Sequence, residues 1–422
     1  MRKALFGLVL ATCAAAQPAP AVRAEVGKAY PELEALYQEL HRHPELSFKE
    51  ARTAARMAEL LAGAGFQVGR AGGGVVGVLR NGGGPTVLLR TELDALPVQE
   101  LSGVPWASEA PGVMHACGHD VHMASWLGAA RALAARRDLW RGTVLMVAQP
   151  AEEIGEGAQA MLKDGLLTRF PRPDFAVAVH VTADLPAGSV GYASGWAMAS
   201  VDSVNITLYG RGGHGAKPDQ TVDPVVLAAR TVLALQTAVS REKDPREPAV
   251  LTVGSIHGGT KHNIIPDEVR LQITLRSFDP KVQAGLIAAI RRIARGEAIA
   301  SGAPREPLVE VDGDTLPAVW NDPALCDRLG AALGRALGPD KVARLKPDMV
   351  SEDFGAFGTA AGIPSVLLRL GAADPGRLQA AQAAGTPLPS LHSPRFVPAL
   401  EPTLRTGALT LALAALEVLG KP

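Results

Sequence analysis

Short apolar runs and longer stretches of helical periodicity alternate through the first half of the chain. Buried strands are predicted at Val75–Arg80, Thr86–Arg90, Thr143–Ala148 and Phe175–Val181. Helical patterns fill the gaps, notably Val121–Ala135 and Gly157–Leu166, and the segment Ser47–Glu50 (SFKE) is typical of a capping box that opens a helix to about Ala64. Strands that alternate with helices indicate βαβ units and a mostly parallel sheet.

The pattern changes after Gly195, where mixed elements suit a small α+β sandwich inserted into the larger domain. The elements expected there are strands at Val201–Tyr209, Ala249–His257 and Glu268–Leu275, and helices at about Asp223–Val239 and Pro280–Ile299. The α/β pattern resumes near Val311, with a helix at Pro323–Leu337, a strand at Ser365–Gly371 and a final helix at about Glu401–Leu419.

The predicted fold class is therefore α/β, with helices on both faces of the sheet. The larger domain comprises residues 25–197 plus 307–422, and the smaller satellite domain comprises residues 198–306.

The first 24 residues predict a signal peptide. A basic start precedes the apolar run Ala4–Ala16, and Val22–Ala24 favours cleavage after Ala24. The run is shorter than the ~20 apolar residues that span a bilayer, so we expect no transmembrane segment in the mature protein. An imperfect lipobox at Leu10–Cys13 leaves lipid anchoring through Cys13 open. We expect an exported protein, either periplasmic or secreted.

The charge balance argues against nucleic acid or an anionic membrane as a partner. Basic and acidic residues number 42 each, and removal of Arg2, Lys3 and Arg23 with the leader leaves 42 − 3 = 39 against 42. Once Cys13 has left, only Cys117 and Cys326 remain, too few for a disulfide framework.

Polar residues follow three of the predicted strands. The segments Arg90–Asp94 (RTELD) and Gln149–Glu153 (QPAEE) each follow one, and His180 lies near the end of a third. Ligands of open parallel sheets bind outside the carboxyl ends of the strands, so we expect these side chains at one edge.

The segment His115–His122 (HACGHDVH) places four histidine or cysteine residues within eight positions, before a predicted helix. A thiolate and an imidazole two residues apart, at Cys117 and His119, can bind one borderline-soft cation or two adjacent cations. One buried histidine or cysteine would more often be a core residue, but the cluster predicts a metal site.

The adjacent carboxylates Glu152 and Glu153 come after a buried strand, where desolvation and mutual repulsion both disfavour them. A dication ligated by one of them offsets both effects and leaves the other free to take a proton from water. A solvated surface pair is the plainer alternative.

In order along the chain, the motifs resemble the aminoacylase and carboxypeptidase class of metallo-amidohydrolases (peptidase family M twenty). The resemblance is to the branch with hippurate hydrolase, N-acyl-amino-acid amidohydrolases and plant auxin-conjugate hydrolases, and it covers essentially the whole mature chain. The motifs are Arg90–Pro97 (RTELDALP), His115–Asp120 (HACGHD), Gln149–Glu153 (QPAEE), His180, Gly212–Pro218 (GGHGAKP), Asn263–Pro266 (NIIP), Ser351–Phe354 (SEDF) and Leu391–Pro394 (LHSP).

The resemblance implies a catalytic, metal-binding larger domain with two divalent metal ions bridged by Cys117. Glu153 and His392 would complete the ligand set of one ion, and His119 and His180 would complete that of the other. Thiolate and imidazole ligands suit zinc best, with manganese and cobalt as alternatives.

The resemblance also implies the catalytic roles. Glu152 would be the general base, and Asp94 would orient the site from outside the ligand set. The satellite domain would form a homodimer and carry His214 towards the partner's active site to polarise the scissile carbonyl. Asn263 and Arg276 would bind carboxylate or carbonyl groups of the substrate. From the residues alone, His214 is a loop histidine and Arg276 a surface charge.

Two positions depart from the family pattern. The chain has Glu92 where the branch usually has Asp and related branches have a metal-binding His, and it has Ser393 where many relatives have Asn. Neither change removes an expected ligand, but either could alter the substrate preference.

The expected activity is metal-dependent hydrolysis of the amide bond in N-acyl amino acids or small aminoacyl or peptide conjugates. A dipeptidase or carboxypeptidase of the same family is the closest alternative. An amidase with Cys117 as nucleophile and a non-catalytic binding protein are the others.

Overall fold

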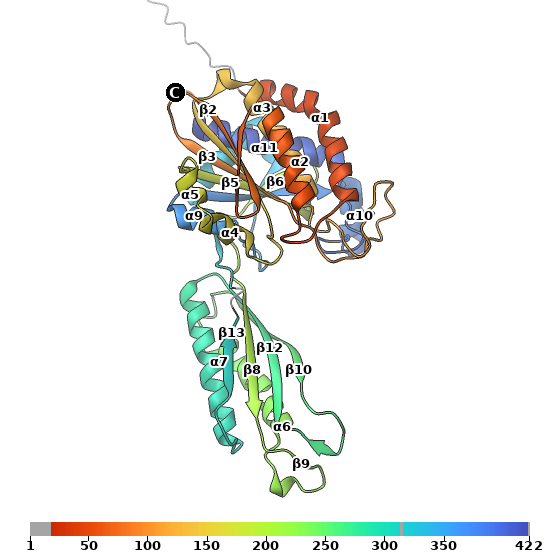
Figure 1. Cartoon of the computed structure of the whole chain (residues 1–422), viewed down its shortest axis with the longest axis vertical. Helices are drawn as coiled ribbons and strands as arrows, with labels where there is room; N and C mark the ends of the chain where they lie inside the picture. The colour runs from red at the N-terminus through yellow and green to blue at the C-terminus, as the bar shows by residue number, and fades with distance from the viewer. Residues whose placement is uncertain (1–17, 313–314, 421–422) are drawn as a thin grey trace, which may run out of the picture.

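The computed structural model describes residues 18–312 and 315–420, so the predicted apolar leader run and Cys13 lie outside the described residues. The chain forms a larger domain with an eight-stranded sheet and a smaller domain with a four-stranded sheet and two long helices (Figure 1). The two domains confirm the predicted α/β fold with an inserted α+β domain.

The sheet of the larger domain has the order β1-β2-β4-β3-β5-β16-β6-β15. Its strands are β1 (Gln67–Ala71), β2 (Gly74–Asn81), β3 (Thr86–Glu92), β4 (Gly142–Gln149), β5 (Phe175–Pro186), β6 (Val190–Tyr192), β15 (Val342–Arg344) and β16 (Ser365–Ala373). The central pairs β4-β3, β3-β5 and β5-β16 are parallel, whereas β1-β2, β2-β4 and β16-β6 are antiparallel. The carboxyl ends of the four central strands therefore share one edge.

Helices cover both faces because the central strands are apolar on both sides. On β3, Leu89 packs into the cluster formed with α1, α2, α3, α8 and α11, while Leu88 packs into the opposite cluster with α4 and α9. The bounds are α1 (Pro18–Arg42), α2 (Ala51–Gly63), α3 (His119–Ala135), α4 (Gly157–Lys163), α5 (Leu166–Arg169), α8 (Pro323–Leu337), α9 (Gly355–Ala361), α10 (Pro375–Ala384) and α11 (Leu400–Leu419). By length and composition α11 could cross a bilayer, but it is a core helix packed on α1 and α3.

Helix α1 begins upstream of the predicted cleavage point. Residues 18–24 form its first turns, Val22 is buried in the core, and Arg23 Nη2 donates to Ala336 O at 2.8 Å. A cut after Ala24 would remove these contacts.

Two local predictions were wrong. The segment Ser47–Glu50 forms no capping box, because Ser47 Oγ donates to Asp94 and the Glu50 carboxylate accepts from Ala151 N, both far along the chain. The single helix expected at Gly157–Leu166 is two short helices, because Gly165 takes a left-handed conformation with φ 83°.

The smaller domain is an antiparallel sheet of order β10-β12-β8-β13 with two helices on one face. Its elements are β8 (Asp202–Tyr209), α6 (Pro224–Arg241), β10 (Ala249–His257), β12 (Glu268–Ser277), α7 (Pro280–Ala300) and β13 (Leu308–Val311). The predicted boundary at 306/307 is too early, because β13 pairs with β8 as an edge strand of the satellite sheet. Below this sheet in Figure 1, β9 (Gly213–His214) pairs with β11 (Ile264–Ile265).

Candidate metal centre

Five predicted ligands converge where the central strands end and α3 begins. Ligand atoms of Cys117, His119 and His180 lie within 4.8 Å of one another, and so do those of Cys117, Glu153 and His392. The two groups share Cys117. The arrangement provides two adjacent three-ligand sets around one sulfur, the donor set expected of two borderline-soft cations.

The hydrogen bonds of two histidines leave one nitrogen of each free to bind a cation. His119 Nδ1 lies 2.8 Å from Asp94 O and His180 Nδ1 lies 2.9 Å from Val181 O. A carbonyl only accepts, so each Nδ1 carries the proton and each Nε2 carries a lone pair. His119 Nε2 is buried and has no hydrogen-bond partner among the described residues, and His180 Nε2 is 3.5 Å from Cys117 Sγ.

His122 is the neighbouring histidine that cannot serve in this way. Its Nε2 accepts from Val181 N at 2.9 Å, which places the proton on Nδ1, and Nδ1 donates to Glu92 Oε2 at 2.9 Å. Glu92 also contacts the buried guanidinium of Arg90. Both Glu92 and His122 are therefore committed to structural contacts, although their atoms lie near His119.

Asp94 holds two of the candidate ligands in place. Its main-chain oxygen accepts from His119, and its carboxylate accepts from Glu153 N at 3.0 Å and from Ser47 Oγ at 2.7 Å. The side chain of Asp94 is buried, and these contacts hold its pKa below the ordinary value even though burial raises it. Asp94 thus has the contacts of an orienting carboxylate.

Left-handed backbone conformations occur next to the ligands. Ala151, just before the paired glutamates, has φ 51°, and His392 has φ 65°. Such conformations cost an L-residue roughly 1–2 kcal/mol, so surrounding contacts must hold them. Gly118 has φ 80° between two ligands, and a Cβ there would lie 2.5 Å from Val181 Cγ2, so glycine is required.

The anionic groups of the cluster need a cation. Burial raises the pKa of Glu152 well above its ordinary value, and Glu352 and Glu153 raise it further. Burial likewise raises the pKa of the Cys117 thiol and that of Glu153. Buried anions that repel one another are stabilised when a dication lies between them, so these residues fit the metal ions that the sequence implies.

Glu152 lies beside the ligands but outside both sets that contain Cys117. Its Oε2 is 3.7 Å from His119 Nε2. Carboxylate oxygens of Glu152, Glu352 and Asp353 also lie within 4.8 Å of one another. Glu352 and Asp353 both contact Arg90, at 2.7 Å and 2.8 Å. Both residues belong to the motif Ser351–Phe354, which by itself predicts no role for them.

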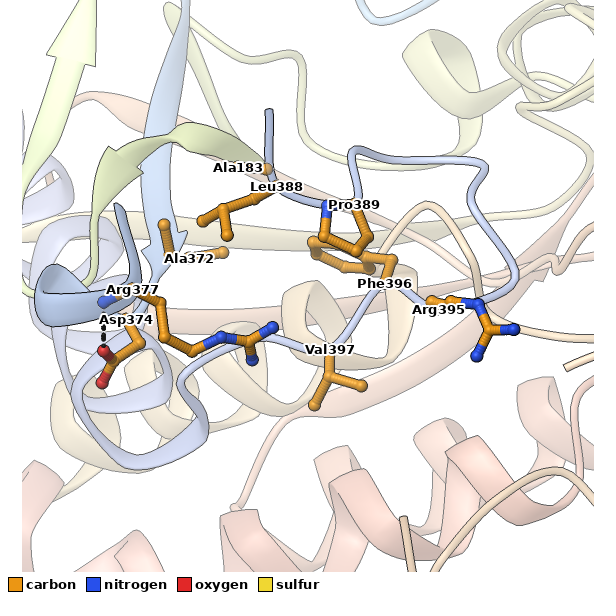
Figure 2. A pocket seen from close by; sticks show the side chains of 10 residues that line it. Ala183, Ala372, Asp374, Arg377, Leu388, Pro389, Arg395, Phe396 and Val397 are labelled. Carbon is orange, nitrogen blue, oxygen red and sulfur yellow. Dashed lines mark hydrogen bonds between the residues drawn. The ribbon is translucent and has the colours of Figure 1, made fainter. Parts of the chain in front are cut away.

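His392 reaches the site on the segment between α10 and α11. Figure 2 shows Leu388, Pro389 and Phe396 gathered around a small cavity beside Ala183 and Ala372. His392 N donates to Ala116 O at 2.9 Å, which ties the segment to the loop that carries Cys117. The His392 side chain is 58% exposed, so this edge of the centre is open.

The three residues predicted in the satellite domain do not gather at the cluster. His214 and Asn263 are exposed neighbours around β9 and β11, at the end of the satellite domain away from the larger domain (Figure 1). Arg276 lies at the other end of β12, where it donates to Ser351 Oγ next to Glu352. Of these three residues, Arg276 is the one that contacts the segment carrying Glu352 and Asp353.

The sequence profile of Peptidase family M20/M25/M40 matches residues 88–398, which carry all of this chemistry. The chain belongs to this family of hydrolases. It is 35% identical to thermostable carboxypeptidase 2 of Saccharolobus solfataricus over 390 residues, covering 91% of this chain and 94% of that one. It is also 35% identical to an IAA-amino acid hydrolase of Arabidopsis thaliana, covering 85% and 79%.

The fold matches that of a solved dinuclear metal-binding peptidase of the M20 family from Bacillus subtilis. The TM-score is 0.77 at 29% identity, and the match covers 93% of this chain and all of that one. The chain therefore shares both the sequence profile of the M20 family and the fold of one of its solved members.

Proposed function

We propose that this M20 protein hydrolyses the amide bond of N-acyl amino acids or small peptide-like conjugates. The observation that carries the proposal is the pair of three-ligand sets that share Cys117, with Glu152 beside them and outside both. That is the arrangement needed for two cations and a separate base. The carboxypeptidase and the IAA-amino acid hydrolase among its relatives support cleavage of a C–N bond in an amino-acid substrate.

Cys117, Glu153 and His392 would hold one divalent ion, and Cys117, His119 and His180 the other. Two such ions supply Lewis acidity, which acidifies water and polarises a carbonyl group. Zinc suits these ligands best, with manganese and cobalt as alternatives.

Glu152 would act as the general base. Its carboxylate would accept a proton from the attacking water and return it to the leaving nitrogen. The distance of 3.7 Å between Glu152 Oε2 and His119 Nε2 supports this role. Burial raises the pKa of the Glu152 carboxyl, and Glu352, Glu153 and Asp353 raise it further, which favours the protonated form that the second step needs.

His214 would complete the site from a second copy of the chain. In a homodimer the exposed end of one satellite domain would lie over the other subunit's metal centre, where the imidazole would stabilise negative charge on the carbonyl oxygen. Asn263, adjacent to His214, would contact the same substrate, and Arg276 would bind its carboxylate.

A substrate panel with metal removal tests the proposal. Purified protein is assayed on N-acyl amino acids, aroyl conjugates and dipeptides as prepared, after chelator dialysis, and after addition of zinc, manganese or cobalt. We expect activity to disappear on chelation and to return with metal, and the preferred member separates an acylase from a dipeptidase. Activity that survives chelation would refute the proposal and point to the Cys117 thiol as nucleophile.

A further inference from the structure

A cavity of about 240 Å³ lies beside β5 and β16, and β5 also carries the candidate ligand His180. Thr182 follows the ligand His180 by two residues on β5, so both side chains face the same side of the sheet. Arg369 is the register partner of His180 on β16 and also lines the cavity. The cavity therefore begins beside a metal ligand, although none of the candidate ligands lines it.

Arg369 is a largely buried cation with few partners. Its side chain is only 15% exposed, its Nη2 is 3.4 Å from Asp348 Oδ2, and its Nη1 is buried with no hydrogen-bond partner among the residues described. Burial lowers the pKa of its guanidinium. Arg90, the other deeply buried arginine of this region, contacts Glu92, Glu352 and Asp353. Arg369 thus retains unused capacity to bind an anion.

The walls of the cavity are held by main-chain hydrogen bonds. Asp348 N donates to Ala197 O at 2.9 Å, and Leu345 N donates to Tyr192 O at 2.8 Å. These bonds fasten the 345–348 loop over the sheet, so the space exists before a ligand enters it. The lining also carries a second cation, Lys346, and two carboxylates, Asp184 and Asp348. A preformed cavity binds a ligand without first ordering its own walls.

The lining suits a short chain that ends in a carboxylate. Ala193, Ala197 and Met198 form an apolar wall. Thr182 and Arg369 line the same cavity, and the Thr182 hydroxyl accepts from Asp184 N at 3.2 Å. A guanidinium binds carboxylate in a planar, two-bond geometry, and methylene groups suit the apolar wall. The volume accommodates a chain of a few carbon atoms but not a second protein segment.

We propose that Arg369 is a specificity residue that binds a second carboxylate of the substrate, in addition to the carboxylate expected at Arg276. The proposal rests on the proposed amidohydrolase function and narrows its substrate class to acyl amino acids with two carboxylates. The second carboxylate can belong to the acyl part, as in a dicarboxylic monoamide, or to the side chain of the amino acid.

Matched substrate pairs that differ in one charge test the proposal with the metal-loaded full chain. N-succinyl-L-alanine is compared with its terminal amide, and N-acetyl-L-glutamate with N-acetyl-L-glutamine. We expect the charged member of one pair to be favoured in kcat/KM by about ten- to a hundredfold, because a bidentate charge-assisted contact is lost in the neutral member. The pair that shows the preference identifies the part of the substrate that Arg369 contacts.

Arg369→Met should abolish the preference while the neutral substrates change less than about threefold, and Arg369→Lys should retain part of it. Arg344→Met is the control, because this exposed arginine on β15 pairs with Asp327 and lines no part of the cavity. Thermal unfolding checks that each variant folds. Succinate serves as a separate binding probe by calorimetry, and its affinity should fall at least tenfold in Arg369→Met only.

The outcomes separate the two proposals. Hydrolysis of all four substrates without a charge preference would overturn the role of Arg369 and leave the proposed function standing. An equal loss on charged and neutral substrates in Arg369→Met would show a structural role and also overturn it. If neither these four substrates nor the wider panel of N-acyl amino acids, aroyl conjugates and dipeptides is hydrolysed, the proposed function fails, and succinate binding that depends on Arg369 still decides whether the anion site exists.

Discussion

Predicted catalytic residues lie both at the metal cluster and at the far end of the satellite domain. Within a single chain the residues of the metal cluster come together, but His214 does not reach them. At the cluster, His119 and Asp94 are buried, and their contacts fix both their orientation and their protonation. At the satellite end, His214 is exposed, and its Nδ1 accepts only a local bond from Ala216 N at 3.0 Å.

The difference indicates where each set of residues does its chemistry. Burying charged groups is costly unless partners compensate, so the cluster must be prearranged within the fold. An exposed imidazole needs no such arrangement and can serve a surface that arrives from outside. This difference fits the proposed homodimer, in which one part of the catalytic site is fixed within a chain and the other part is supplied by the second chain.

The largest expected effect on turnover comes from a change at Glu152, in the part of the site that one chain holds. Glu152→Gln should lower kcat by about a thousandfold or more, because the amide keeps the shape of the side chain but cannot accept the proton. Both metal ions should remain bound, since Glu152 lies outside the two ligand sets. Steady-state kinetics together with metal analysis of the purified variant check this; near-normal turnover would exclude Glu152 as the base.

A change at His214, which a second subunit would supply, should cause a smaller loss of activity, and mixing two variants should restore part of that activity. His214→Ala should lower kcat about a hundredfold, the effect of losing one group that stabilises the carbonyl oxygen. When Glu152→Gln and His214→Ala subunits are dissociated and reassociated together, half of the dimers are mixed, and each contains one intact site. Activity should return to about a quarter of the wild-type value.

The unmixed variants are the control for this complementation. A mixture that stays as inactive as its components would show that His214 acts within its own chain or not at all. Such a result would contradict the proposal that a second subunit supplies part of the catalytic site.

Sequence patterns located the fold and most of the candidate ligands because both leave local signals. Helices α6, α7 and α8 begin at an aspartate that caps the helix before a proline, at Asp223, Asp279 and Asp322. Strands β9 and β11 are two residues long, too short to show any period. The pairing of β13 with β8 joins segments about a hundred residues apart, which periodicity cannot reveal.

At the site, spacing revealed Cys117 and His119, whereas His392 lies far along the chain and came only from the family resemblance. Ser47 was assigned to a local cap, but a partner distant in sequence determined its contact. Arg369 also leaves a local signal in the sequence, because it is the one charged residue in the apolar run Ser365–Gly371. A charge within a buried strand indicates a partner or a ligand.

The buried residue His41 allows the two regions to be compared by their contribution to stability. His41 lies buried between Asp120 Oδ2 at 2.6 Å and Glu100 Oε1 at 3.1 Å, beside the start of α3. Burial lowers the pKa of His41, but the two carboxylates raise it to about 9. His41→Gln should lower the free energy of unfolding at pH 6 by about 3 kcal/mol, because it removes a buried cation from between two carboxylates.

The pH dependence follows from the direction of that shift. The folded-state pKa of His41 is about 9, above the ordinary 6.5, so its contribution is complete below pH 6.5 and is lost as the pH rises through 9. In urea unfolding at pH 6, 8 and 10, the difference in the free energy of unfolding between wild type and His41→Gln should become smaller as the pH rises. His214→Ala should change stability by less than about 0.5 kcal/mol at every pH, since the residue is exposed. If His214→Ala proved as destabilising as His41→Gln, the satellite end would be a structural part of one chain rather than a surface held ready for another.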